Sequence, residues 1–228
     1  MRGLKLLAID TTESACSAAL LNDGEITERF EIAPRRHSTL ILPMMDELLL
    51  EAGLKLDQLD ALAFARGPGS FTGVRIATAI TQGAAFGANL PVIPVSSLQA
   101  LAEGCRRRRD AKGVLVALDA RMQEVYWGAF RTDETGRLVS VLDEAVVAPT
   151  DVVVPEYADW HAVGSGWGAY QEILESRCEN LQSVDPDAQI HAADVARLAV
   201  AAFAAGATVR AENALPTYLR DQVAWSKS

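Results

Sequence analysis

The chain has 228 residues, half of them hydrophobic, so it is long enough to bury one large core or two smaller ones. Its 30 acidic and 21 basic residues give a formal net charge of −9 at pH 7, which argues against nucleic-acid binding by the chain alone. No apolar run is long enough to span a bilayer, and the first residues lack a signal-peptide pattern, so we expect a cytoplasmic protein without a membrane partner. The three cysteines are widely spaced and odd in number, which is typical of free thiols in a reducing compartment.

Three short apolar segments at the start of the chain predict β-strands. They cover residues 4–10, 15–21 and 25–32. Residues 22–24, which read Asn-Asp-Gly, are typical of a hairpin turn, so the strands should be antiparallel. Helical segments and further strands follow, and we therefore expect a mixed α/β sheet rather than a doubly wound one.

Two helices are predicted over residues 38–52 and 74–86, and both carry more apolar side chains than one sheet-facing stripe needs. Surplus apolar surface on an acidic chain indicates a face for docking a partner. The alternative is that the second half of the chain covers this surface. The residues that we assign to the docking face are Leu40, Ile41, Met44, Met45, Leu48, Val74, Ala77, Ile80 and Ala84.

A glycine-rich loop joins a predicted buried strand at residues 59–65 to the second of these helices. The loop consists of Gly67, Pro68, Gly69, Ser70, Phe71, Thr72 and Gly73. Its spacing matches neither the GxxxxGK[ST] nor the GxGxxG pattern, and it contains no lysine. We therefore predict a structural turn that directs the helix toward a partner, with anion binding at the helix start as the lesser alternative.

The second half of the chain begins with the same pattern as the first. Residues 114–118 predict a buried strand that ends in Asp119, and a hairpin is predicted over 123–147. The repetition suggests a structural duplication. The predicted lobes are residues 1–105 and 106–228. The remaining predicted elements are a strand at 91–95, a helix that begins near Ser96, a strand, glycine loop and helix over 160–177, a helix at 192–205, and a tail at 216–224 that packs back on the first lobe or docks elsewhere.

Residues with catalytic chemistry are sparse. The three histidines are far apart and form no HxxxH or HExxH motif, so no metal site is predicted. No serine lies in a GxSxG motif, and no catalytic residue is predicted. Asp10, Thr11 and Thr12 follow the first strand and are the candidates for holding a nucleotide or Mg²⁺, although strand-end aspartates more often cap turns.

Five segments that together span most of the chain resemble the TsaB (YeaZ) family. They are LLAIDTT at 6–12, HSTLILP at 37–43, GPGSFTGVRIA at 67–77, LDARMQEVYW at 118–127 and PTYLRDQVA at 216–224. The resemblance implies an α/β, two-lobed actin/Hsp70/sugar-kinase-like fold with mixed sheets flanked by helices. Such a fold agrees with the suspected duplication.

The resemblance also implies a function: support for TsaD, the transferase that forms N6-threonylcarbamoyladenosine at position 37 of ANN-decoding tRNAs. TsaD binds a metal through an HxxxH motif that this chain lacks, so the resemblance implies a non-catalytic scaffold subunit. It further implies that the ATPase TsaE joins the complex and that the complex uses ATP, while this chain alone holds no cofactor. The resemblance also implies that the chain meets tRNA only through the complex. Partly exposed apolar faces also favour a homodimer through the same helices when the partner is absent, and the sequence leaves open whether the chain alone is a homodimer or a monomer. The alternative is a nucleotide-hydrolysing or phosphotransfer enzyme that uses Asp10.

Overall fold

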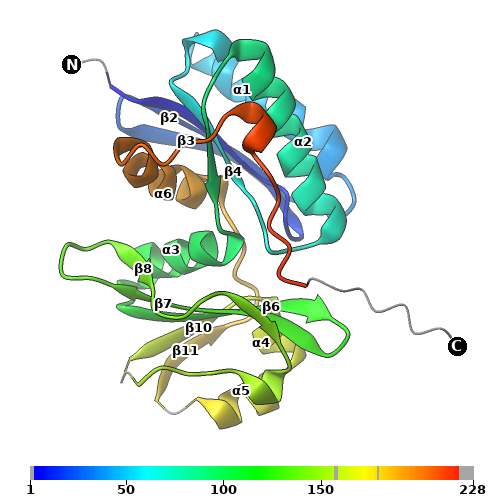
Figure 1. The fold of residues 1–228 in the computed structure, drawn as a ribbon, viewed down its shortest axis with the longest axis vertical. Coiled ribbons are helices and arrows are strands. Elements are labelled where there is room, and N and C mark those ends of the chain that lie inside the picture. The colour runs from blue at the N-terminus through cyan, green and yellow to red at the C-terminus, as the bar shows by residue number, and fades with distance from the viewer. Residues whose placement is uncertain (1–2, 157–158, 179, 221–228) are drawn as a thin grey trace, which may run out of the picture.

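The computed structural model describes residues 3–156, 159–178 and 180–220. Two lobes lie one above the other, and each is built on one β-sheet (Figure 1). Within the described ranges, no helix has the length and hydropathy that a membrane span requires. Residues 221–224 of the predicted tail lie outside these ranges.

The sheet of the first lobe has the strand order β3-β2-β1-β4-β5. Its strands are β1 (Lys5–Asp10), β2 (Ala15–Asn22), β3 (Glu25–Ile32), β4 (Ala61–Ala65) and β5 (Val92–Val95). The first three are antiparallel neighbours, as predicted, whereas β4 and β5 are added in parallel. Every residue of β4 is buried, because helices cover both faces of the sheet.

Helices α1 (His37–Glu51) and α2 (Phe71–Ala88) cover one face of this sheet, and α6 (Ala192–Ala204) covers the other (Figure 1). Alternate side chains of β4 point to the two faces. Leu62 and Phe64 belong to the core beneath α1 and α2. Ala61, Ala63 and Ala65 belong to the core beneath α6. The larger side chains therefore fill the space between the sheet and helices α1 and α2, whereas the alanines allow α6 to approach the opposite face of the sheet closely.

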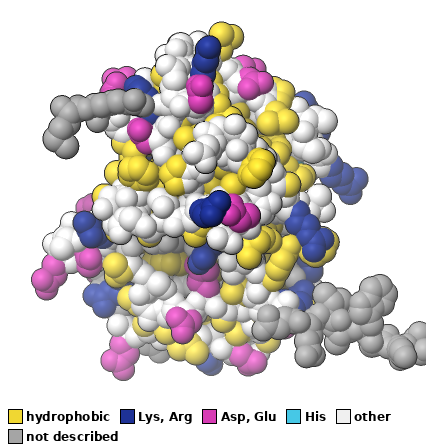
Figure 2. Space-filling view, turned by 45° about the horizontal axis from the view of Figure 1, so that its top comes forward, with side chains coloured by type: hydrophobic (Ala, Val, Ile, Leu, Met, Phe, Trp, Pro, Cys, Tyr) yellow, Lys and Arg dark blue, Asp and Glu magenta, His cyan; other side chains and the backbone are white. Residues whose placement is uncertain are grey.

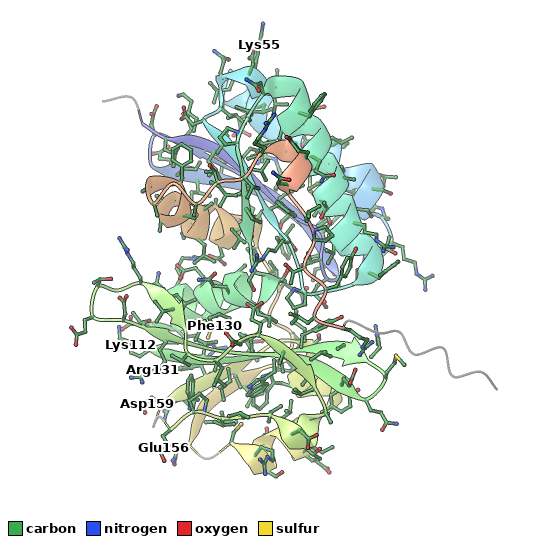
Figure 3. The ribbon with its side chains drawn as sticks, viewed as in Figure 1. Lys55, Lys112, Phe130, Arg131, Glu156 and Asp159 are labelled. Atoms are coloured by element: carbon green, nitrogen blue, oxygen red, sulfur yellow. The ribbon has the colours of Figure 1, made fainter. Side chains whose placement is uncertain are left out.

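The sheet of the second lobe has the order β11-β10-β6-β7-β8, and β9 pairs with β7. Its strands are β6 (Gly113–Arg121), β7 (Glu124–Thr132), β8 (Leu138–Ser140), β9 (Ala145–Val147), β10 (Trp160–Val163) and β11 (Leu181–Asp185). Helix α3 (Ser97–Arg109) covers the inner face, where Phe130 of β7 lies in the core beneath it (Figure 3). Helices α4 (Ser165–Ala169) and α5 (Gln171–Arg177) lie on the outer face (Figure 1). Short 3₁₀ helices occupy Leu56–Gln58, Pro149–Asp151 and Ala211–Asn213.

The two sheets repeat one topology. In each, three antiparallel strands come first along the chain, and two parallel strands are then added beside the first of them. Strand β6 therefore corresponds to β1, and β10 and β11 correspond to β4 and β5. The predicted duplication and the predicted two-lobed α/β fold, with mixed sheets flanked by helices, are confirmed.

The chain does not divide between the lobes at residue 105, because that position falls inside α3. Helix α3 packs against β6 and β7 of the second lobe, whereas α6 returns to pack against β1, β2 and β4 of the first. The two helices form the layer between the sheets, and each covers an apolar sheet face that would otherwise face water. Strand β11 was not predicted, because its sequence LQSVD has neither a continuous apolar run nor many β-branched residues.

Candidate functional site in the interlobe cleft

The glycine loop packs directly on the turn that follows β1. A Cβ atom on Gly69 would lie 2.5 Å from the carbonyl oxygen of Thr12, and one on Gly73 would lie 2.0 Å from that of Thr11. The backbone N–H of Ser70 donates to the carbonyl oxygen of Thr12 at 2.7 Å. Glycine is therefore required at these two positions by the close approach of another backbone.

Helix α2 begins at Phe71, inside the glycine loop, and is capped by Ser70. The Ser70 hydroxyl oxygen accepts from the backbone N–H of Gly73 at 3.0 Å. The hydroxyl of Thr11 donates to the carbonyl oxygen of Gly73 at 2.7 Å. The loop thus fixes where α2 starts and ties that start to the end of β1.

The three candidates for holding a nucleotide, Asp10, Thr11 and Thr12, are fully buried, and none of them lines the interlobe cavity described below. One carboxylate oxygen of Asp10 accepts from the N–H and the hydroxyl of Thr12, at 3.1 and 2.6 Å. The other oxygen has no hydrogen-bond partner among the described residues. Burial raises the pKa of Asp10 to about 7, against the opposing effect of the Thr12 hydrogen bonds. Asp10 caps a turn, and its carboxyl does not reach the cleft.

A cavity of about 730 Å³ opens between the lobes. Its lining comes from four parts of the chain that are far apart in the sequence. They are Glu13 and residues 69–71, 74 and 75 of the first lobe, residues 119–121 and 126 of the second lobe, and residues 217–220 near the end of the described chain. Sequence reasoning did not find this cavity, because it treated these stretches separately. The available signal was that three of the five family-like segments supply its walls.

Carboxyl groups and arginines both line the cavity. Burial raises the pKa of Glu13 to about 8, the nearby Asp10 carboxyl adds to this rise, and Arg121 opposes it. Glu13 is therefore mostly protonated at neutral pH. Asp119 accepts from both the N–H and the guanidinium of Arg121, at 2.8 and 2.9 Å. Among the residues described, no three His, Cys, Asp or Glu side chains form a group that could hold a metal ion.

An arginine on α2 forms one edge of the cavity. The guanidinium of Arg75 stacks on the ring of Phe71, 3.4 Å from the ring centre. Its Nε donates to the hydroxyl oxygen of Tyr218 at 2.9 Å. The start of α2 and the C-terminal stretch are therefore joined at the cavity mouth.

The sequence and the fold both match known proteins. A family model described as "TsaD: tRNA N6-adenosine threonylcarbamoyltransferase" matches residues 27–228. The tRNA threonylcarbamoyladenosine biosynthesis protein TsaB of Escherichia coli (strain K12) is 44% identical, over 98% of each chain. The chain belongs to the TsaB family. The TsaB of Haemophilus influenzae is 43% identical over 100% of this chain and 98% of its own length. The solved structure of YeaZ from Pseudomonas aeruginosa superposes with a TM-score of 0.90 at 45% identity, and the match covers 95% of this chain and 100% of that one.

The docking face that we predicted for this TsaB-family chain needs correction. Six of its nine residues are buried inside the chain's own fold and are not available to a partner. They are Ile41, Met44, Met45, Leu48, Val74 and Ala77. These side chains form the stripe that packs α1 and α2 on the sheet, and sequence reasoning could not tell that stripe from the outer one.

The outer faces of α1 and α2 nevertheless carry large exposed apolar side chains. Leu42 and Leu50 of α1 are 49% and 83% exposed, and Phe86 of α2 is 80% exposed. Leu40, Ile80 and Ala84, the other three predicted residues, are half-buried. Figure 2 shows hydrophobic side chains spread over the upper part of the molecule, which is the first lobe.

Proposed function

We propose that this TsaB-family chain is a non-catalytic subunit of the machinery that forms N6-threonylcarbamoyladenosine in tRNA, where it binds and supports TsaD. The observation that carries the proposal is the exposed apolar outer face of α1 and α2. Large exposed side chains such as Leu50 and Phe86 are costly in water unless a partner covers them.

A partner with the same fold suits this face. The match of residues 27–228 to a model named for TsaD supports a partner that shares the duplicated topology and has an equivalent pair of helices. Two such pairs can pack as a four-helix contact. Ala79, Gly83 and Gly87 are exposed on α2, and their small size allows a partner helix to approach closely. A second copy of this chain can use the same face when TsaD is absent.

The polar groups support a non-catalytic role. The three histidines have separate partners: His37 lies 3.2 Å from the carbonyl oxygen of Ala15, His161 contacts Ser183 and His191 contacts Glu28. The Asp10 carboxyl is shielded from the cavity, which disfavours the phosphotransfer alternative. In this proposal the complex uses ATP, TsaE joins it, and tRNA is reached through TsaD because this chain has a net charge of −9.

The test places a charge on the outer helix face. Leu50→Glu and Phe86→Glu should each weaken binding to TsaD of the same organism by at least thirtyfold, which is about 2 kcal/mol and typical of a hot spot. The matched control is Val153→Glu, which changes a side chain that is 62% exposed on the second lobe. The measurement is co-purification followed by titration calorimetry, with circular dichroism to verify folding. Wild-type affinity in both helix variants would contradict the proposal.

A further inference from the structure

The last described residues of the chain run from the first lobe past the interlobe cavity to the second lobe (Figure 1). We propose that residues 215–220, which we name the strap, hold the two lobes together across the cavity and that release of the strap widens the cavity. The strap belongs to no helix or strand. Its position therefore depends on a small set of contacts at its two ends.

The first end of the strap is fixed to the glycine loop and to α2. The backbone N–H of Thr217 donates to the carbonyl oxygen of Arg66 at 2.8 Å, and the hydroxyl of Tyr218 accepts from Arg75. A Cβ atom on Gly67 would lie 2.9 Å from the carbonyl oxygen of Thr217. Gly67 also has a φ of +100°, which side-chain-bearing residues rarely adopt. The first glycine of the loop thus leaves room for the strap, as the other two leave room for the turn after β1.

The second end of the strap is fixed to the β6–β7 hairpin through one side chain. The guanidinium of Arg220 donates to the carbonyl oxygen of Ala120 at 3.2 Å and forms an ion pair with the carboxylate of Glu124. The side chains of Arg220 and Glu124 are 21% and 36% exposed, so water only partly screens the pair. Arg220 therefore links the strap to the second lobe.

The hairpin that receives Arg220 has an unfavourable backbone. Arg121, Met122 and Gln123 have φ values of 61°, 56° and 61°, so three consecutive residues without the freedom of glycine lie in the left-handed region. Such conformations persist where surrounding contacts hold them, and they cluster at switch and ligand-binding segments. Arg220 also lies 3.5 Å from the sulfur of Met122. The strap ends on a segment that can relax when this contact is lost.

The strap forms one wall of the cavity. Residues 217–220 line it, opposite first-lobe residues such as Ser70 and second-lobe residues such as Tyr126. The rings of Tyr218 and Phe71 lie 6.3 Å apart at the mouth. The volume of about 730 Å³ lies in the range of small-molecule sites in other proteins. Moving the strap away would widen the opening of this cavity to solvent and free the lobes to separate.

The reporter for opening is a thiol inside the cavity. Ala120 lines the cavity and is 5% exposed, and the three native cysteines are buried, so Ala120→Cys supplies a single reporter with a low background. The reaction of the full-length Ala120→Cys chain with a bulky disulfide reagent is timed with and without Arg220→Ala. We expect Arg220→Ala to raise the rate at least tenfold. A tenfold rise corresponds to 1.4 kcal/mol in the opening equilibrium.

The matched control is Arg210→Ala, because the Arg210 side chain is 83% exposed and pairs with Glu212 in the same C-terminal region without contacting the second lobe. The Arg210→Ala variant should leave the labelling rate unchanged. Equal rates with and without Arg220→Ala would overturn the proposal. If Arg220→Ala also makes the native thiols react, the charge-reversed variant Arg220→Glu is compared with the double variant Arg220→Glu, Glu124→Arg. The double variant restores the ion pair and should label slowly again. Fast labelling of the double variant would contradict the proposal.

Discussion

The contact between the glycine loop and the turn after β1 predicts a large effect for a single added methyl group, in Gly73→Ala. The new Cβ would lie 2.0 Å from the carbonyl oxygen of Thr11 and 2.7 Å from the hydroxyl oxygen of Ser70. The first atom belongs to a buried backbone, and the second caps α2, so neither can move without loss. Overpacking costs about 1–3 kcal/mol, and a lost N-cap adds about 1 kcal/mol. We therefore expect the free energy of unfolding to fall by about 2–4 kcal/mol.

The control is Gly83→Ala in the same helix, because a Cβ at Gly83 meets no atom within 4 Å. Alanine should stabilise the helix there by about 1 kcal/mol. Urea denaturation gives both free energies, and thermal unfolding should show a loss of about 5–15 °C for Gly73→Ala, at about 2–4 °C per kcal/mol for a chain of this size. If Gly73→Ala were as stable as Gly83→Ala, the loop would not be held by this contact.

Two further predictions concern buried groups. Ala77→Glu places a carboxylate where the side chain is fully buried, so it should lower the free energy of unfolding by several kcal/mol. Ala84 is half-buried, so Ala84→Glu should cost less than about 1 kcal/mol. Equal denaturant midpoints for the two variants would refute this prediction. The folded-state pKa of Asp10, about 7, lies above its unfolded value of about 4, so the folded state binds the proton more tightly and stability falls as pH rises between these values. Asp10→Asn should therefore remove part of the stability difference between about pH 5 and pH 8 in urea melts, because the raised pKa of Glu13 supplies another part. An unchanged difference would argue against a buried, protonated Asp10.

Local patterns in the sequence were sufficient to predict most of the first lobe. Continuous apolar runs marked β1 and β4, and the Asn-Asp-Gly turn marked the β2–β3 hairpin. Ser96 marked the start of α3, which it caps. These features depend on residues close together in the chain, so one sequence is enough to predict them.

Features that depend on distant contacts were not predictable in the same way. The apolar residues of α1 and α2 form two stripes, and only the position of the sheet shows that Ile41 and Ala77 face inward. The interlobe cavity joins residues near positions 13, 70, 120 and 218, which no local pattern connects. Helix α3 follows the strands of the first lobe but packs on the second sheet, and α6 follows the strands of the second lobe but packs on the first sheet. This arrangement depends on which apolar sheet face each helix covers, which no local pattern shows.

The central claim is that this TsaB-family chain, of 24.4 kDa, works by docking on TsaD through the outer face of α1 and α2. The most direct measurement is the mass of the species formed when the two purified proteins are mixed, by light scattering after gel filtration, with and without ATP. We predict a joint species containing both chains, and its loss when Leu50→Glu and Phe86→Glu are combined. Two separate peaks for the wild-type pair, or a joint species that persists in the double variant, would contradict the claim.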